Sequence, residues 1–154
     1  MKTILLFLIF SSVCFSQTSK ELIGSWQAAP HVAAGYDDTY TFNDDGTFYY
    51  FNNQMNCAKR EVGYGGTWEL KGKSIQLIIT YYDIEKGGWL EPSDGSCGSD
   101  SMLVGSTINK VLVFPYEQEV LKIANYKIET EDGADRYTME INNRKHWYFS
   151  KFEY

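Results

Sequence analysis

Residues 39–51 read Thr39-Tyr40-Thr41-Phe42-Asn43-Asp44-Asp45-Gly46-Thr47-Phe48-Tyr49-Tyr50-Phe51. Aromatic and β-branched residues lie on both sides of a short polar segment, and such residues fit the half-buried surface of a sheet. Within the polar segment, Gly46 can take the positive φ that a tight hairpin turn requires. The stretch therefore predicts two antiparallel strands joined by a turn at residues 43–46.

Further hairpins follow on the C-terminal side of this stretch. Gly65 and Gly66 begin the next predicted strand, where glycines typically mark a bulge or a bend that lets a sheet curl. Turns are expected at residues 71–73, 133–135 and 142–143. Apolar and aromatic residues bounded by Gly, Asn or Pro predict strands at residues 65–70, 74–82, 106–114 (ended by Pro115), 120–130, 137–141 and 145–152.

The clear alternation ends after the strand that carries Ile75, Leu77, Ile79 and Tyr81. We expect these four side chains to share one face, because successive side chains in a strand point to opposite faces. From residue 83 to 102, Gly, Ser, Asp and Pro dominate. A segment of this length predicts a long loop, and such loops are commonly functional or tied by a disulfide.

These elements together predict an all-β fold. The count is eight or nine short strands, with one helical turn near residues 19–23, and 16% of all residues are aromatic. Consecutive hairpins form a meander, and closing the meander removes its unpaired edges. We therefore expect an up-and-down antiparallel β-barrel; two packed sheets are the alternative.

Residues 1–16 have the pattern of a secretory signal peptide. Lys2 precedes a short apolar run, and the small residue Ser16 precedes the polar Gln17. The apolar run is too short to cross about 30 Å of hydrocarbon, so we do not expect the chain to span a membrane. Cleavage after Ser16 would leave residues 17–154 as one secreted or periplasmic domain.

The cysteines indicate one disulfide. Cys14 lies in the leader, and its lipidation is disfavoured because bulky Val13 precedes it. Cys57 and Cys97 remain in the mature chain, where an even pair outside the cytoplasm is typically bridged; two free thiols are the alternative. Neither cysteine belongs to a Cys-x-x-Cys motif, so the spacing does not indicate zinc.

The net charge narrows the classes of partner. The formal charge is −6 at pH 7, and removal of the leader with its single lysine makes it −7. Nucleic acids and anionic lipids select clusters of Lys and Arg, so neither is expected as a partner. The acidic surface either keeps the protein soluble or recognises a basic partner.

Sequence motifs for catalysis are missing. The chain has no nucleophile elbow, phosphate-binding loop or dinucleotide fingerprint. His31 and His146 are its two histidines, and Asp37 and Asp38 near His31 are explained by solvation of a strand start as well as by a metal or acid–base cluster. We therefore expect no enzymatic activity, no cofactor and no metal site.

Three segments resemble the small bacterial lipocalin-like proteins, which are secreted meander barrels. The segments are Leu22-Ile23-Gly24-Ser25-Trp26, Tyr40-Thr41-Phe42-Asn43-Asp44-Asp45-Gly46-Thr47-Phe48 and Gly66-Thr67-Trp68-Glu69-Leu70-Lys71-Gly72-Lys73-Ser74-Ile75. The resemblance implies structural roles for Gly24, which opens the first strand, and Trp26, which packs across one barrel end. In larger lipocalins an arginine stacks over that tryptophan, and Arg136 or Arg144 would take this place.

Two functions are consistent with these features. The first is a carrier or sensor of a small apolar molecule, which requires a cavity of at least about 300 Å³. The alternative is a protein–protein interaction module, inhibitor-like or immunity-like, with a filled barrel and exposed apolar side chains around Trp89. Aromatic residues of the strands either fill a small barrel or line its pocket. The candidate ligand-binding residues are Tyr40, Phe42, Tyr50, Trp68, Tyr81, Trp89 and Trp147.

Overall fold

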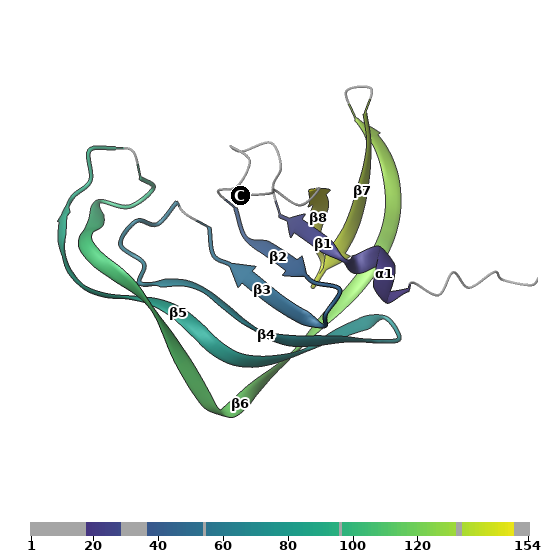
Figure 1. Ribbon diagram of the computed structural model, residues 1–154. Helices are drawn as coiled ribbons and strands as arrows, with labels where there is room; N and C mark the ends of the chain where they lie inside the picture. Colours follow the sequence, from purple (N-terminus) through teal and green to yellow (C-terminus); the bar gives the residue numbers. More distant parts are fainter. Residues whose placement is uncertain (1–17, 29–36, 54, 96, 132–133, 150–154) are drawn as a thin grey trace, which may run out of the picture.

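The computed structural model describes residues 18–28, 37–53, 55–95, 97–131 and 134–149. In this part of the chain, eight antiparallel strands follow one another in chain order around a closed barrel, so the predicted all-β up-and-down barrel is confirmed (Figure 1). The barrel closes because β1 pairs with both β2 and β8. The elements are α1 (Ser19–Leu22), β1 (Gly24–Gln27), β2 (Thr39–Phe42), β3 (Thr47–Phe51), β4 (Glu61–Lys71), β5 (Ser74–Pro92), β6 (Ser101–Glu131), β7 (Ala134–Ile141) and β8 (Arg144–Phe149).

Tight turns join the hairpins where the sequence predicted them. Gly46 has a φ of 80° in the β2–β3 turn, and Gly72 has a φ of 64° in the β4–β5 turn. Asn142 and Asn143 join β7 to β8 with φ values of 50° and 66°, a conformation that asparagine tolerates better than most residues. The turn predicted at residues 133–135 lies partly outside the described residues.

Alternate residues of the strands fill the barrel. The predicted bend is present at Gly65 and Gly66, where the register between β4 and β5 shifts. The core side chains pack with almost no exposure to solvent, partly buried residues such as Tyr64 pack against them, and Leu22 of α1 covers one end. The largest fully buried apolar side chains are Trp26, Phe42, Phe48, Leu22, Ile75, Leu77, Leu121, Met139 and Ile141.

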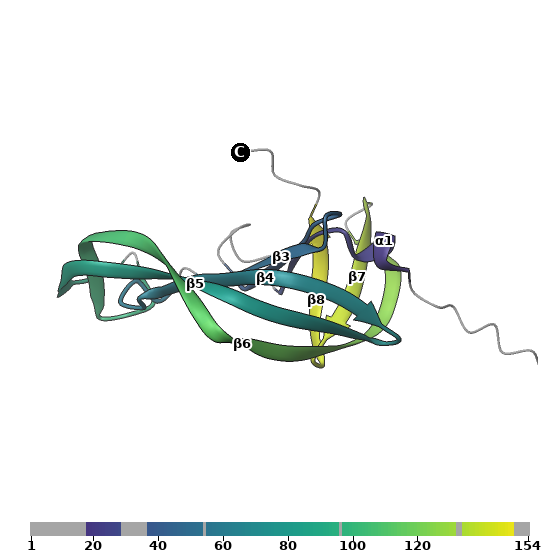
Figure 2. The same ribbon diagram turned by 60° about the horizontal axis from the view of Figure 1, so that its bottom comes forward.

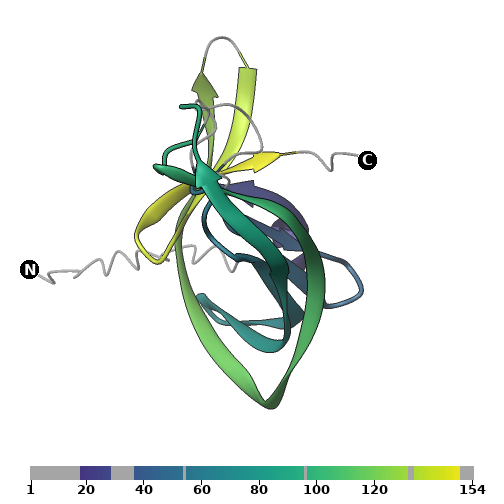
Figure 3. The ribbon, with the colours of Figure 1, turned by 90° about the vertical axis from the view of Figure 1, so that its left-hand side faces the viewer.

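The hairpin of β5 and β6 continues well beyond the barrel. We call this projection the arm: residues 82–92 of β5 paired with residues 101–111 of β6. Figures 1 and 2 show the two strands side by side along its length, and Figure 3 views the molecule from the side of the arm. The expectation of a long loop over residues 83–102 was therefore wrong, and only residues 93–100 connect the two strands. Pairing with distant residues makes strands of a segment whose own composition is typical of loops.

Pro115 does not end a strand. It follows a cis peptide bond from Phe114 and lies inside β6, so the strands predicted at 106–114 and 120–130 are one. Ile79 pairs with Glu117 and Tyr81 with Leu112, so four residues of β6 oppose one of β5 at this point. Proline is accepted at such a bulge because the ladder hydrogen bonds are already interrupted there.

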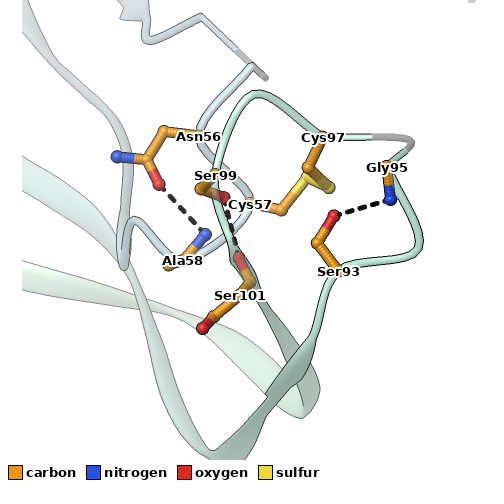
Figure 4. The surroundings of a disulfide bond; sticks show 8 residues. All are labelled: Asn56, Cys57, Ala58, Ser93, Gly95, Cys97, Ser99 and Ser101. Atoms are coloured by element: carbon orange, nitrogen blue, oxygen red, sulfur yellow. Dashed lines mark hydrogen bonds between the residues drawn. A yellow bond between two sulfur atoms is a disulfide. The ribbon is translucent and has the colours of Figure 1, made fainter.

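The predicted disulfide joins residues 93–100, which connect the two strands of the arm, to the loop between β3 and β4. Cys57 and Cys97 are bonded, with their Cα atoms 5.9 Å apart (Figure 4). The β3–β4 loop also accepts backbone hydrogen bonds from this connection and from the arm: Gly98 N donates to Met55 O over 2.7 Å, and Leu103 N donates to Cys57 O over 2.8 Å. These bonds fix the far end of the arm.

The predicted leader, residues 1–16, lies outside the described residues, as does His31. Among the described helices, none has the length and apolar character needed to cross a bilayer.

Candidate functional site

The two ends of the barrel differ. The register of β1 against β2 places Gly24, which follows α1, beside Phe42, and places Gln27 beside Thr39 at the opposite end. We call this opposite end the open end. A pocket of about 200 Å³ lies there, and the residues that line it come from β2 and its preceding segment, β3, the end of β7 and the start of β8. The lining residues are Asp38, Tyr40, Tyr50, Ile141, Asn142, Arg144 and His146.

A guanidinium held by two carboxylates forms one wall of the pocket. Arg144 donates from Nη1 to Asp38 Oδ2 over 2.8 Å and from Nη2 to Asp37 Oδ1 over 3.1 Å. Asp38 Oδ1 accepts the backbone and side-chain N–H groups of Asn53. Burial raises the pKa of Asp38, but the hydrogen bonds from Asn53 and Arg144 outweigh it and hold the pKa below its ordinary value. The carboxylate is thus ionised at neutral pH.

His146 forms the inner part of the pocket. Its Nδ1 lies 2.8 Å from the carbonyl oxygen of Arg144, so the neutral ring carries its proton on Nδ1 and leaves Nε2 as an acceptor. Burial lowers the pKa of His146 below its ordinary value, and the backbone hydrogen bond opposes this shift only in part. The ring is therefore neutral at pH 7.

Four tyrosines of adjacent strands continue the wall around the open end. Tyr40, Tyr50, Tyr64 and Tyr82 pair across β2, β3, β4 and β5 and so project from the same face. Their successive ring centroids are 4.7, 4.7 and 5.6 Å apart, and His146 lies 5.9 Å from Tyr40. We call the four tyrosines the tyrosine arc.

Two glutamates of β6 lie at the far end of the arc. The Tyr64 hydroxyl donates to Glu119 Oε2 over 3.0 Å, and the Tyr82 hydroxyl donates to Glu117 Oε2 over 2.7 Å. Burial and the bond to Glu117 raise the pKa of Tyr82 to about 12. Burial also raises the pKa values of Tyr40, Tyr50 and Tyr64. All four phenols therefore keep their protons at physiological pH.

The predicted ligand-binding residues do not form one group. Tyr40 and Tyr50 line the open-end pocket. Phe42 is fully buried against Trp68, and Trp68 Nε1 donates to Asn43 O over 3.0 Å, near the α1 end. Trp147 is on the opposite face of β8 from His146, with Lys145 Nζ 4.8 Å from its ring centre.

The predicted placement of Tyr81 was wrong. Ile75, Leu77 and Ile79 are buried as expected, but the register shift after Ile79 reverses the facing, so Tyr82 projects inward and Tyr81 outward. Tyr81 instead packs under Lys110, whose Nζ lies 3.8 Å from the ring centre.

Trp89 lies on the arm rather than in a loop, and 57% of it is exposed. Its Nε1 donates to Glu91 Oε1 over 2.6 Å.

Trp26 packs across the α1 end, as the resemblance implied. Its ring contacts among the described residues are with Tyr126 and Tyr148, at 6.0 and 5.2 Å between centroids. Arg144 binds Asp37 and Asp38 at the open end instead of covering this indole.

Sequence reasoning missed much of the pocket. Asp38 and Arg144 are 106 residues apart in the chain, and no local pattern joins them. Tyr64 has a local signal, because it stands between Gly63 and Gly65 in a strand that alternates. Tyr82 has no such local signal, since the face on which its side chain lies depends on the register shift between Ile79 and Tyr81.

Comparison with known proteins gives one match. The family model described as "Lipocalin-like domain" matches residues 22–102, just over half of the chain. No curated protein and no solved structure matches significantly.

Proposed function

The chain belongs to the lipocalin-like domain family, and we propose that it binds a compact polar molecule in the open-end pocket. The observation that carries this function is a pocket of about 200 Å³ lined by ionised, hydroxyl and imidazole groups at one end of the barrel. Binding, without catalysis, is the proposed role.

The expected apolar ligand does not suit this pocket. Drug-sized ligands occupy roughly 300–1,000 Å³ of mostly apolar space. This pocket is smaller, and Ile141 is the one aliphatic residue among the described residues that line it. The interior beyond the pocket is occupied by buried side chains such as Phe42 and Phe48. A small molecule with several hydrogen-bonding groups fits these walls better.

Nuclear magnetic resonance (NMR) tests this function. A chemically mixed fragment library of small sugars, amines, carboxylates and heterocycles is titrated into the labelled mature protein. We expect at least one class to shift the resonances of Ile141 and His146, and Tyr50→Ala to weaken that binding. Trp147→Ala, on the other face of β8, is the matched control. If no fragment shifts the pocket resonances, the function is rejected.

Exposed apolar side chains on β6 favour a second candidate, binding of a protein partner. Phe114 is 91% exposed and Leu112 is 78% exposed, and Ile108 is also exposed. Contiguous exposed apolar residues typically mark interaction sites. Glu85 pairs with Ile108 on this face, and Lys110 lies between Ile108 and Leu112. The partner expected is therefore a protein whose contact surface is mainly apolar.

Site-specific photo-crosslinking tests the second candidate. A photoreactive residue at Phe114 should capture a partner that the same probe at Lys71, on the opposite barrel end, does not capture. The purified partner should then lose affinity for Leu112→Asp. Equal capture at both positions, or unchanged affinity, would reject this candidate.

We also propose that the protein works outside the cytoplasm. The Cys57–Cys97 disulfide supports this location, because disulfides persist in oxidising compartments. N-terminal sequencing of the protein from its host should find Gln17 as the first residue.

A further inference from the structure

We propose that the ligand of the open-end pocket is a neutral sugar ring, and that the tyrosine arc holds further units of the same glycan chain. This inference rests on the proposed function and names the class of its ligand. It follows from three features: the mixture of donors and acceptors in the pocket, the balance of charge there, and the continuity of the aromatic wall.

The pocket offers donors and acceptors side by side. Arg144 and Asn142 supply N–H donors, whereas Asp38 carboxylate oxygens and His146 Nε2 are acceptors. A sugar hydroxyl both donates and accepts, so a ring with several hydroxyls can satisfy both kinds of group. An anion is bound chiefly by donors and a cation chiefly by acceptors, so an ion would use only one of the two kinds of group.

The charges in the pocket disfavour an ionic ligand. Arg144 is already bonded to Asp37 and Asp38, so a ligand carboxylate would approach two carboxylates, and a ligand ammonium would approach a guanidinium. The imidazole of His146 is neutral and adds no charge. A neutral polar molecule avoids both repulsions.

The aromatic wall supplies the apolar contact that sugar rings also need. The C–H groups on one side of a sugar ring are apolar and pack on aromatic surfaces, while its hydroxyls remain at the edge. Neighbouring rings of the arc are tilted by 48°, 33° and 52° rather than stacked in parallel, as rings lining a curved wall must be. Tyr50, Tyr64 and Tyr82 are only partly buried, and Tyr50 lines the open-end pocket.

The arc is longer than one sugar ring. Neighbouring strands lie roughly 4.8 Å apart, so the arc spans about 14 Å from β2 to β5. Glu119 and Glu117 anchor the hydroxyls of Tyr64 and Tyr82 at the far end and keep free carboxylate lone pairs there. The pocket thus holds the terminal unit, and the arc holds the units that follow.

Isothermal titration calorimetry with NMR mapping tests this inference. The probes are neutral oligosaccharides of one to six units, derived from cellulose, xylan, mannan, chitin and starch. We expect one series to bind, with the oligosaccharide at least about tenfold tighter than its monosaccharide. Tyr82→Ala should weaken the oligosaccharide about tenfold and leave the monosaccharide unchanged, since it removes one aromatic contact far from the pocket.

Matched variants separate this result from a folding defect. Tyr81→Ala removes the neighbouring tyrosine on the other face and should leave the affinities for both sugars unchanged. Thermal unfolding of Tyr81→Ala and Tyr82→Ala reports whether the fold is intact, and Tyr82→Phe should retain most of the oligosaccharide affinity because it keeps the ring.

The outcomes distinguish this inference from the function on which it rests. Binding of amines, carboxylates or heterocycles in the pocket, with no sugar bound, overturns the sugar ligand and leaves the binding function standing. Equal affinities of mono- and oligosaccharide overturn the role of the arc. A pocket that binds no probe of any class overturns both.

Discussion

The indole Nε1 of Trp26 donates a hydrogen bond over 2.8 Å to the carbonyl oxygen of Leu22, and both residues are fully buried. Leu22 is the last residue of α1, where helix carbonyls lack partners within the helix. The bond therefore satisfies a buried acceptor and holds α1 over the barrel end. This contact explains why a tryptophan, rather than another large apolar residue, suits this position.

Trp26→Phe should lower the free energy of unfolding by about 2–4 kcal/mol. The substitution leaves the Leu22 carbonyl unsatisfied and creates a cavity beside Tyr148. Urea denaturation followed by circular dichroism measures the loss. Trp89→Phe is the control, because an exposed tryptophan should change stability by less than about 0.5 kcal/mol. Similar effects of both substitutions would contradict the role given to Trp26.

Gly24→Ala should destabilise the barrel more than Gly72→Ala. Both glycines have positive φ, at 130° and 64°, which costs an alanine about 1–3 kcal/mol. A Cβ on Gly24 would also overlap the Tyr148 ring, whereas a Cβ on Gly72 would meet no atom within 4 Å. The excess loss for Gly24→Ala, about 1–3 kcal/mol, is measured by denaturation of the two variants. Equal losses of stability in the two variants would show that the Tyr148 ring moves aside without a cost in free energy.

Replacing both Cys57 and Cys97 by serine should loosen the arm and leave the barrel intact. The disulfide closes a separation of 40 residues, for which the chain-entropy model gives about 4 kcal/mol. Hydrogen exchange should accelerate most at residues 55–60 and 97–103, which meet at the bridge, and less in β1, β2 and β7. Uniform acceleration throughout the chain would show that the arm and barrel unfold as one unit.

Stability should fall as the pH decreases from 6.5, through the protonation of His146. Well above pH 6.5, its ordinary pKa, the imidazole is neutral in the folded and unfolded chains. Because the folded pKa is lowered, the unfolded chain takes up its proton first as the pH falls. The loss continues until the pH reaches the folded pKa. Asp38 causes a separate loss of stability at lower pH. Because its folded pKa is lowered, this loss begins as the pH falls through its ordinary pKa of 3.8.

His146→Asn isolates this pH dependence, since asparagine can still donate to the Arg144 carbonyl and does not titrate. Free energies of unfolding measured from pH 7 to pH 5 should decrease less in the variant than in the wild type. Parallel curves would assign the pH dependence to other groups.

The barrel was predictable because each hairpin depends on residues that lie close together in the sequence. Each hairpin near β2, β4 and β7 has its own turn residues, and Gly46, Gly72 and Asn142 adopt the positive φ that those turns need. The bridge between Cys57 and Cys97 was predictable from composition and compartment. The alternation of Ile75, Leu77 and Ile79 correctly gave the buried face of β5.

The arm and the pocket were not predictable, because both depend on contacts between distant residues. Residues 83–92 have a loop-like composition and become a strand only by pairing with residues 101–110. The register shift at Thr80 exchanges the faces on which Tyr81 and Tyr82 lie. Gly65 and Gly66 on the partner strand predicted a bend there, but not this exchange. Asp38 and Arg144 meet only after the barrel has closed.

The pairing of β1 with β8 has a practical consequence for the choice of fragment boundaries. The matched region, residues 22–102, stops just after β6 begins at Ser101. A fragment cloned to that boundary would lack the strands that pair with β1 and with the inner length of β5. It would have two unprotected ladders of backbone N–H and C=O groups and should precipitate rather than fold. The smallest autonomous unit must extend at least to Phe149.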